Sequence, residues 1–155
     1  NNREIYFIIS ELLSKGIDKD DIYRKVFNTY SEGRLRLMGY VLYEKMQVYP
    51  QFRAALICLS KEEQGKFRYV KGDTEGIVNY GLSIKGIVFA AIFIENKEEK
   101  IIKISFRSQG DFDVNQFARD YFNGGGHRNA AGGKSEVSME ETIRKFEDLV
   151  TKLSI

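Results

Sequence analysis

A run of three glycines followed by the only histidine of the chain limits most strongly what this sequence can fold into. The run is Gly124, Gly125 and Gly126, and His127 follows it directly. Three adjacent glycines lose more backbone entropy on folding than any other tripeptide, so a folded domain keeps them where its backbone must approach something closely. A single glycine would already end the helix expected up to Phe122. The run therefore predicts a loop whose amide groups converge on an anion.

The residues after the glycines predict the same kind of site. We expect residues 127–131 to form a short helical turn whose free N–H groups face the glycine loop and favour a phosphate. His127 stands at the mouth of this site as the candidate catalytic residue, a donor to a phosphoryl oxygen, and Arg128 is a candidate phosphate contact. A lone histidine is more often structural, and here the glycine context favours the functional role. Because no second histidine and no cysteine lies near it, we expect no metal ligand.

A second candidate contact lies at the end of an alternating strand. Residues 101–108 alternate between apolar and polar side chains, as in a strand with one buried face. Arg107 then points to the face opposite Phe106, where an arginine is most often solvated. A short loop and one helix separate it from the glycine loop, so the two can line one cleft, and a planar guanidinium there would grip a phosphate bidentately. We therefore take Arg107 and Ser108 as candidate phosphate contacts.

Charge and hydropathy exclude several classes of function. Lys and Arg total 24 against 22 Asp and Glu, a net charge of +2, which argues against long duplex DNA as a ligand. The longest apolar run, residues 87–94, is too short to cross a membrane, and no secretory signal is visible. Cys58 is the only cysteine and lies in an apolar run, which favours a buried thiol in a reducing compartment, here the cytoplasm.

The part of the chain before Pro50 has helical periodicity. Apolar residues recur at helical spacing in a first segment that Gly16 ends, in a second that Asp18 can cap, and in a third that runs toward Pro50. We assign these apolar stripes to packing in a core or between domains.

After Pro50 the pattern becomes that of a sheet. Residues 54–59 form an apolar run typical of a strand covered on both faces. Residues 87–94 and 101–108 predict an antiparallel hairpin, and residues 134–137 predict a further short strand. Two helices are expected to begin after N-cap residues, at Asp113 and at Ser138. The pattern predicts an α+β (α/β) fold, a helical linker followed by a mixed β-sheet domain with flanking helices.

Four stretches of the chain together resemble a known family. Phe106 to Ser108, Val114-Asn115 and Gly124 to Gly132 resemble the signature of the DHH-associated C-terminal domain. That domain occurs in DHH-family phosphoesterases, which include RecJ-like exonucleases, oligoribonucleases and cyclic-dinucleotide phosphodiesterases. The segment Asp73 to Asn79 most resembles the bacterial bifunctional oligoribonuclease and 3′-phosphoadenosine 5′-phosphate phosphatase. The resemblance covers the chain from about Ser31 to its C-terminus.

The resemblance implies a division of the chain into two parts. Residues 1–48 would be the end of a catalytic domain and a helical linker, and residues 49–155 the DHH-associated substrate-binding domain. In this family an N-terminal domain with an Asp-His-His motif binds two Mn²⁺ ions and activates water, and the C-terminal domain closes over it. This sequence has no Asp-His-His segment, and its start at Asn1 rather than Met is typical of a fragment or processed product.

The resemblance also implies roles for the residues named above. Arg107 and Ser108 would contact phosphate or the terminal nucleotide. Gly125, Gly126 and His127 would hold the scissile phosphate against the metal ions, Gly124 and Arg128 are counted with them as candidate phosphate contacts, and Asn115 falls on a matching position of less defined role.

The activity implied is that of a metal-dependent phosphoesterase whose metal-binding half is missing. We expect the whole enzyme to hydrolyse short single-stranded RNA (nanoRNA) or 3′-phosphoadenosine 5′-phosphate, and this fragment alone to be inactive. Its expected partner is the N-terminal DHH domain of the same protein. We expect no binding to a membrane, and a homodimer is left open. Two alternatives remain: a cyclic-dinucleotide phosphodiesterase, and a non-catalytic RNA-binding module of the alanyl-tRNA-synthetase type.

Overall fold

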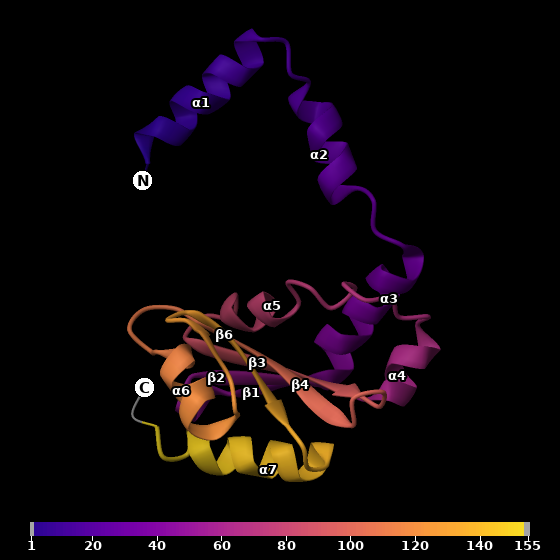
Figure 1. Ribbon diagram of the computed structural model, residues 1–155, viewed down its shortest axis with the longest axis vertical. Coiled ribbons are helices and arrows are strands. Elements are labelled where there is room, and N and C mark those ends of the chain that lie inside the picture. Colours follow the sequence, from indigo (N-terminus) through magenta and orange to yellow (C-terminus); the bar gives the residue numbers. More distant parts are fainter. Residues whose placement is uncertain (1, 154–155) are drawn as a thin grey trace. The chain divides into compact units, whose positions relative to one another are not determined.

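The computed structural model describes residues 2–153 and divides the chain into two compact units, with the boundary between Glu32 and Gly33. The first unit contains helices α1 (Arg3–Ser14) and α2 (Lys19–Phe27) (Figure 1). As expected, Gly16 follows α1 with a φ of 83°, and the Asp18 side chain caps α2.

The helices of the first unit expose their apolar side chains. Neither α1 nor α2 has a buried residue, and Tyr6 and Phe7 are 74% and 67% exposed. Apolar surface of this extent is typical of a face that packs against another protein surface. That these stripes pack between domains stays a prediction.

The second unit is built on a mixed sheet. Within the described residues the sheet has six strands in the order β1-β2-β3-β4-β6-β5 (Figure 1). The strands are β1 (Met46–Tyr49), β2 (Ala54–Leu59), β3 (Phe89–Asn96), β4 (Ile101–Ser108), β5 (Gly125–His127) and β6 (Ala130–Ser135). Strands β2 and β3 run parallel, and the other neighbouring strands run antiparallel. The expected α+β fold is confirmed.

Helices cover both faces of this sheet. On one face, helices α6 (Val114–Tyr121) and α7 (Met139–Val150) bury a phenylalanine-rich cluster with β3 and β4 (Figure 1). On the other face lie α3 (Glu32–Tyr40), a π-helical turn (Val41–Lys45), α4 (Lys61–Lys66) and α5 (Val78–Leu82) (Figure 1). The apolar side chains of this second face, such as Ile57 and Ile92, pack against Leu37 and Val78.

Several local expectations are confirmed. Every residue of β2 is buried, as expected of a strand covered on both faces, and β3 pairs with β4 as the predicted hairpin. The Asp113 side chain accepts a hydrogen bond from the Gln116 N–H at the start of α6, and Ser138 forms the capping box with Glu141.

Two expectations of secondary structure are wrong. The third helical stripe was expected to run toward Pro50, but the π-helical turn ends the helix and residues 46–49 form β1. Pairing of β1 with the buried strand β2 outweighs helical spacing here. The strand expected at residues 134–137 is β6, which begins four residues earlier at Ala130. The sequence did not indicate the first part of this strand, because its glycines have no side chains that could show an apolar periodicity.

Candidate functional site

The glycine–histidine segment forms a β-hairpin, and the helical turn expected over residues 127–131 is wrong. Strand β5 ends at His127, Arg128 and Asn129 make the turn, and β6 starts at Ala130. The amide groups are also used differently from the expectation. Gly124 N–H donates to the Ala118 carbonyl at 3.1 Å, and Gly126 N–H donates to a side chain of α6. These two amides are therefore committed within the fold and do not face an anion.

Close backbone packing explains most of the glycines. A Cβ atom added at Gly124 would lie 1.9 Å from the Gly132 carbonyl oxygen, and one at Gly126 would lie 2.5 Å from that of Ala130. Both positions therefore exclude any side chain. Gly125 differs, because an added Cβ would meet only Asn115 and Arg119 at distances of 3.5 Å and more, which is ordinary contact. The middle glycine is not required by packing.

Arg107 and His127 lie in one row, by which we mean residues directly opposite one another across neighbouring strands of the sheet. Arg107 on β4 is opposite Ala130 on β6, and Ala130 is opposite His127 on β5. Directly opposed residues project to the same face of a sheet. The sheet therefore brings together two candidates that are 20 positions apart in the sequence, and only a small alanine separates them.

Helix α5 covers one end of this row. On the other side of Arg107 the row continues through Ala90 and Ala55. Gly81 of α5 lies so close above them that an added Cβ would be 2.9 Å from the Ala90 Cβ atom. The helix therefore packs on β2, β3 and β4, so Arg107 is half-buried, and His127 at the far end of the row is exposed.

The guanidinium of Arg107 retains most of its donors. Its Nη1 atom donates to the carbonyl oxygen of the preceding residue, Phe106, at 2.9 Å. Arginine carries five N–H donors, so the remaining ones can face a ligand. The described residues contain no carboxylate in an ion pair with Arg107. An anion would therefore meet an uncompensated positive charge.

Ser108 faces away from this row. It is 6% exposed, and its hydroxyl donates to the Phe112 carbonyl at 2.7 Å. The same oxygen accepts a hydrogen bond from the Asn129 side-chain amide at 2.9 Å. Ser108 thus connects the end of β4 to the turn of the glycine hairpin. The structure places it as a support of the hairpin and does not bring it to the face of Arg107 and His127.

Asn115 supports the hairpin from α6. Its Oδ1 atom accepts one hydrogen bond from the Gly126 N–H at 2.9 Å and another from the Arg119 Nε at 3.0 Å. Arg119 lies one helical turn after Asn115, and its guanidinium is held beside Gly125. Arg119 is exposed and is a candidate that the sequence did not reveal. In the sequence, only the four-residue spacing of Asn115 and Arg119, which places them on one face of a helix, indicates this contact.

Arg128 is held by an ion pair on the turn. Its Nη2 atom donates to the backbone and side-chain oxygens of Asp111, at 3.0 and 3.1 Å. The Arg128 carbonyl also accepts a hydrogen bond from the Val114 N–H at 2.8 Å. The side chain is about half exposed, so the ion pair is weak and a ligand can compete for it.

The described part of the chain contains no group of side chains that could hold a metal ion. Within residues 2–153, no three histidine, cysteine or carboxylate side chains are grouped so as to hold a metal ion. That His127 is not a metal ligand stays a prediction. Over the same residues, no helix combines the length and the apolar character that crossing a bilayer requires.

The fold and the site define a class of protein. A row with an arginine and a histidine, beside a glycine hairpin on an α+β sheet, defines a candidate anion-binding domain. Residues 49–153 match the family model of the DHHA1 domain, which covers most of the chain. The chain belongs to the DHHA1 family, the domain associated with DHH phosphoesterases, and the expected family is confirmed.

Two solved structures are similar to this chain. An exopolyphosphatase-related protein from Bacteroides fragilis is 62% identical, with a TM-score of 0.92, over 98% of this chain and 44% of its own. A pGpG-specific phosphodiesterase from Vibrio cholerae is 17% identical, with a TM-score of 0.61, over 95% of this chain and 50% of its own. The second likeness concerns the fold alone. The chain thus spans less than half of the Bacteroides fragilis protein, and no curated protein matches it.

Proposed function

We propose that this chain is the substrate-binding part of a metal-dependent phosphoesterase that hydrolyses short oligoribonucleotides or 3′-phosphoadenosine 5′-phosphate. The observation that carries the proposal is the shared row of Arg107 and His127, with Arg107 half-buried and His127 exposed. A guanidinium and an imidazole on either side of Ala130 can bind different oxygens of one phosphate group. Membership of the DHHA1 family supports a phosphate ester as the substrate.

Each side chain has a distinct part in this proposal. Arg107 would hold the non-bridging oxygens of the phosphate through its fork of donors. His127 would donate a hydrogen bond to the negative charge that develops when water attacks phosphorus and the P–O bond to the leaving group breaks. The attacking water would be activated outside residues 2–153, because these hold no metal-ligand cluster. We propose an Asp-His-His domain of the same protein, with Mn²⁺, for that part.

Dinucleotides are a second candidate substrate class. The Vibrio cholerae phosphodiesterase is specific for pGpG, and it has this fold. Polyphosphate is a further substrate to test, because the Bacteroides fragilis protein is called exopolyphosphatase-related. All these compounds present a phosphate to the same row, so rates must distinguish between them. The buried free thiol of Cys58 agrees with a cytoplasmic protein.

The test uses the full-length protein and measures kcat/KM for a short oligoadenylate, 3′-phosphoadenosine 5′-phosphate, a cyclic dinucleotide and polyphosphate. We expect His127→Ala to lower turnover of the preferred substrate by about 10² or more. Arg107→Lys keeps the charge but loses the bidentate geometry, so it should raise KM. Arg144→Ala, an exposed arginine of α7, is the matched control. Wild-type kinetics in both site variants with every substrate would refute the proposal.

A further inference from the structure

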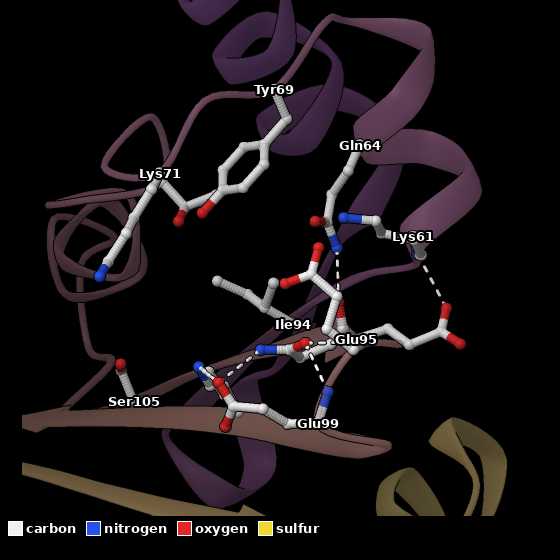
Figure 2. A pocket seen from close by; sticks show the side chains of 12 residues that line it. Lys61, Gln64, Tyr69, Lys71, Ile94, Glu95, Glu99 and Ser105 are labelled. Carbon is white, nitrogen blue, oxygen red and sulfur yellow. Dashed lines mark hydrogen bonds and ion pairs between the residues drawn. The ribbon is translucent and has the colours of Figure 1, made fainter.

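A cavity lies on the same sheet face as Arg107. It has a volume of about 550 Å³, within the range of small-molecule sites. Its floor includes Ser105 of β4, and its walls come from α4, from the segment after it, and from the end of the β3–β4 hairpin (Figure 2). Lys103 of β4 also lines it. Ser105 and Arg107 alternate with Phe106, which is buried on the other face. The cavity and the arginine–histidine row therefore open on one side of the sheet.

The cavity is one nucleotide unit away from the row. Ser105 precedes Arg107 by two residues, which places their Cα atoms about 7 Å apart along a strand. The residue opposite Ser105 on β6 is Gly132, and the residue opposite Gly132 on β5 is Gly125. Gly132 has no side chain that could separate the cavity from the row, and Gly125 lies beside Asn115 and Arg119 of α6. A ligand can therefore extend from Arg107 across Ser105 into the cavity.

One wall of the cavity carries an aromatic ring and a cation. Figure 2 shows Tyr69 and Lys71 above Ser105, with the Lys71 side chain extending toward the sheet. Tyr69 is half-buried, with its ring packed at the margin of the core. Within residues 2–153, neither the Tyr69 hydroxyl nor the Lys71 ammonium makes a hydrogen bond or a close ion pair, and Lys71, after Lys103, helps to lower the pKa of Glu99, which also lines the cavity. A nucleobase can stack on such a ring, and the ammonium can contact a phosphate.

The segment that carries this wall is preformed. Arg34 of α3 donates from Nη1 to the Gly72 carbonyl and from Nη2 to the Glu75 carbonyl, both at 3.2 Å. The Asp73 carboxylate accepts a hydrogen bond from the Val70 N–H at 2.8 Å, which closes a tight turn. The position of Tyr69 and Lys71 is therefore fixed before a ligand arrives, which lowers the entropy cost of binding.

The other wall is acidic. Glu95 accepts a hydrogen bond from the Lys61 N–H at 2.8 Å, and Glu99 is paired with Lys103 and with the Asn96 amide. A carboxylate oxygen can accept more than one hydrogen bond, so each keeps capacity for a donor. The exocyclic amino groups of adenine, guanine and cytosine are such donors, whereas uracil has no amino group and offers only its ring N3–H. This wall therefore favours amino-bearing bases and repels phosphates.

We propose that this cavity is a nucleobase subsite for the nucleotide next to the phosphate held at Arg107 and His127. The base lies between Tyr69 and the carboxylates of Glu95 and Glu99, and Lys71 contacts the following phosphate. The subsite rests on the proposed function, because that function supplies the phosphate from which the nucleotide extends. It makes the enzyme prefer oligoadenylate over oligouridylate, and it extends the substrate beyond a single phosphate group.

The experiment uses full-length protein, with Tyr69→Leu and Lys71→Gln as test variants. Steady-state kinetics on short oligoadenylate and oligouridylate separate KM from kcat, and fluorescence anisotropy of a labelled oligoadenylate in EDTA measures Kd without turnover. Loss of one stacked base predicts that Tyr69→Leu raises KM and Kd about 5- to 30-fold, with kcat within about twofold. The preference for adenylate should shrink in this variant. Tyr43→Leu, at a position 86% exposed, is the matched control.

The outcomes separate the subsite from the proposed function. Hydrolysis of oligoadenylate with unchanged KM and Kd in both variants would overturn the subsite and leave the function intact. Absence of hydrolysis by the wild-type protein would overturn the function. In that case, weaker anisotropy binding in Tyr69→Leu would still support the subsite, and absence of wild-type binding would overturn both. Circular dichroism of each variant shows whether a loss comes from misfolding.

Discussion

The Asn115 side-chain oxygen accepts a hydrogen bond from the Gly126 N–H at 2.9 Å and thereby connects helix α6 to the glycine hairpin. The same oxygen holds the Nε atom of Arg119 at 3.0 Å. One acceptor therefore positions both the backbone next to His127 and a second arginine. The hairpin has a short strand at the edge of the sheet, so it depends on such contacts from outside the sheet.

Replacing Asn115 by alanine should loosen the hairpin more than the core. We expect Asn115→Ala to lower stability by about 1 kcal/mol, the usual net worth of a hydrogen bond, and to lower kcat/KM of the full-length enzyme about tenfold. Asn115→Asp keeps the acceptor and should retain most activity. Thermal unfolding and kinetics measure the two effects. Gln116→Ala, which removes an exposed contact of the same helix, is the control. Equal kcat/KM in Asn115→Ala and Gln116→Ala would contradict the role.

Two neighbouring glycines should respond oppositely to alanine. Gly126→Ala forces a Cβ atom to within 2.5 Å of the Ala130 carbonyl oxygen, so we expect the hairpin to be displaced and the melting temperature to fall. Gly125→Ala meets only ordinary contacts and should fold like the wild type. If Arg119 contacts the substrate, Gly125→Ala, whose methyl group would lie beside the Arg119 guanidinium, should raise KM without a change in melting temperature.

Both the melting temperature and KM of the two glycine variants must be measured. Calorimetry and kinetics on the same preparations separate lost folding from lost binding. A lower melting temperature in Gly125→Ala, equal to that of Gly126→Ala, would show that packing rather than ligand access requires the middle glycine.

Sequence patterns predicted the strands and helices whose side chains face a core. The buried run of β2, the β3–β4 hairpin and the caps at Asp113 and Ser138 depend on local chemistry and burial, which the sequence displays directly. The family followed from the same short motifs. Arg107 was placed on the face opposite Phe106 by alternation alone, and the structure agrees.

The features that the sequence did not predict depend on contacts between segments that are distant in the sequence. The glycine segment has no side-chain periodicity, so a helical turn and a β-hairpin were equally compatible with it, and pairing with β4 through β6 decided for the hairpin. Arg119 became a candidate only because that hairpin brings Gly125 beside it. The cavity around Tyr69 depends on Arg34, which lies 38 positions before the Gly72 carbonyl that it holds.

Ser108 is expected to affect stability and not binding. Ser108→Ala removes the donor to the Phe112 carbonyl and the acceptor of the Asn129 amide, both next to the core. Groups left without partners there cost about 1 to 3 kcal/mol. We therefore expect a lower free energy of unfolding in urea but nearly unchanged KM per folded molecule. Ser105→Ala, on the face of Arg107, is the matched variant, and it should leave stability unchanged. A large rise of KM in Ser108→Ala would restore the serine as a ligand contact.

Glu63 should make the second unit sensitive to acid. Its carboxylate accepts hydrogen bonds from the Tyr40 hydroxyl at 2.6 Å and from the Ser60 N–H at 2.8 Å, and it pairs with the Lys45 ammonium at 2.8 Å. Burial alone would raise the pKa of Glu63, but the bonds from Lys45, Tyr40 and Ser60 outweigh it and lower the pKa to about 2. Because the folded pKa lies below the ordinary value of 4.5, protonation opposes folding.

The lowered pKa of Glu63 determines the pH range in which its carboxylate stabilises the fold. The stabilisation from Glu63 is complete above about pH 5, and it is lost as the pH falls from about 4.5 toward 2, by an amount on the order of 2 kcal/mol. Glu63→Gln should therefore be less stable than the wild type at pH 7, and the difference should shrink by pH 3. Urea unfolding at pH 7, 4 and 3 measures it, with the exposed Glu62→Gln as control. A constant difference between Glu63→Gln and the wild type across this range would mean that the carboxylate carries no such coupling, because only a group with a lowered folded pKa loses its contribution in acid.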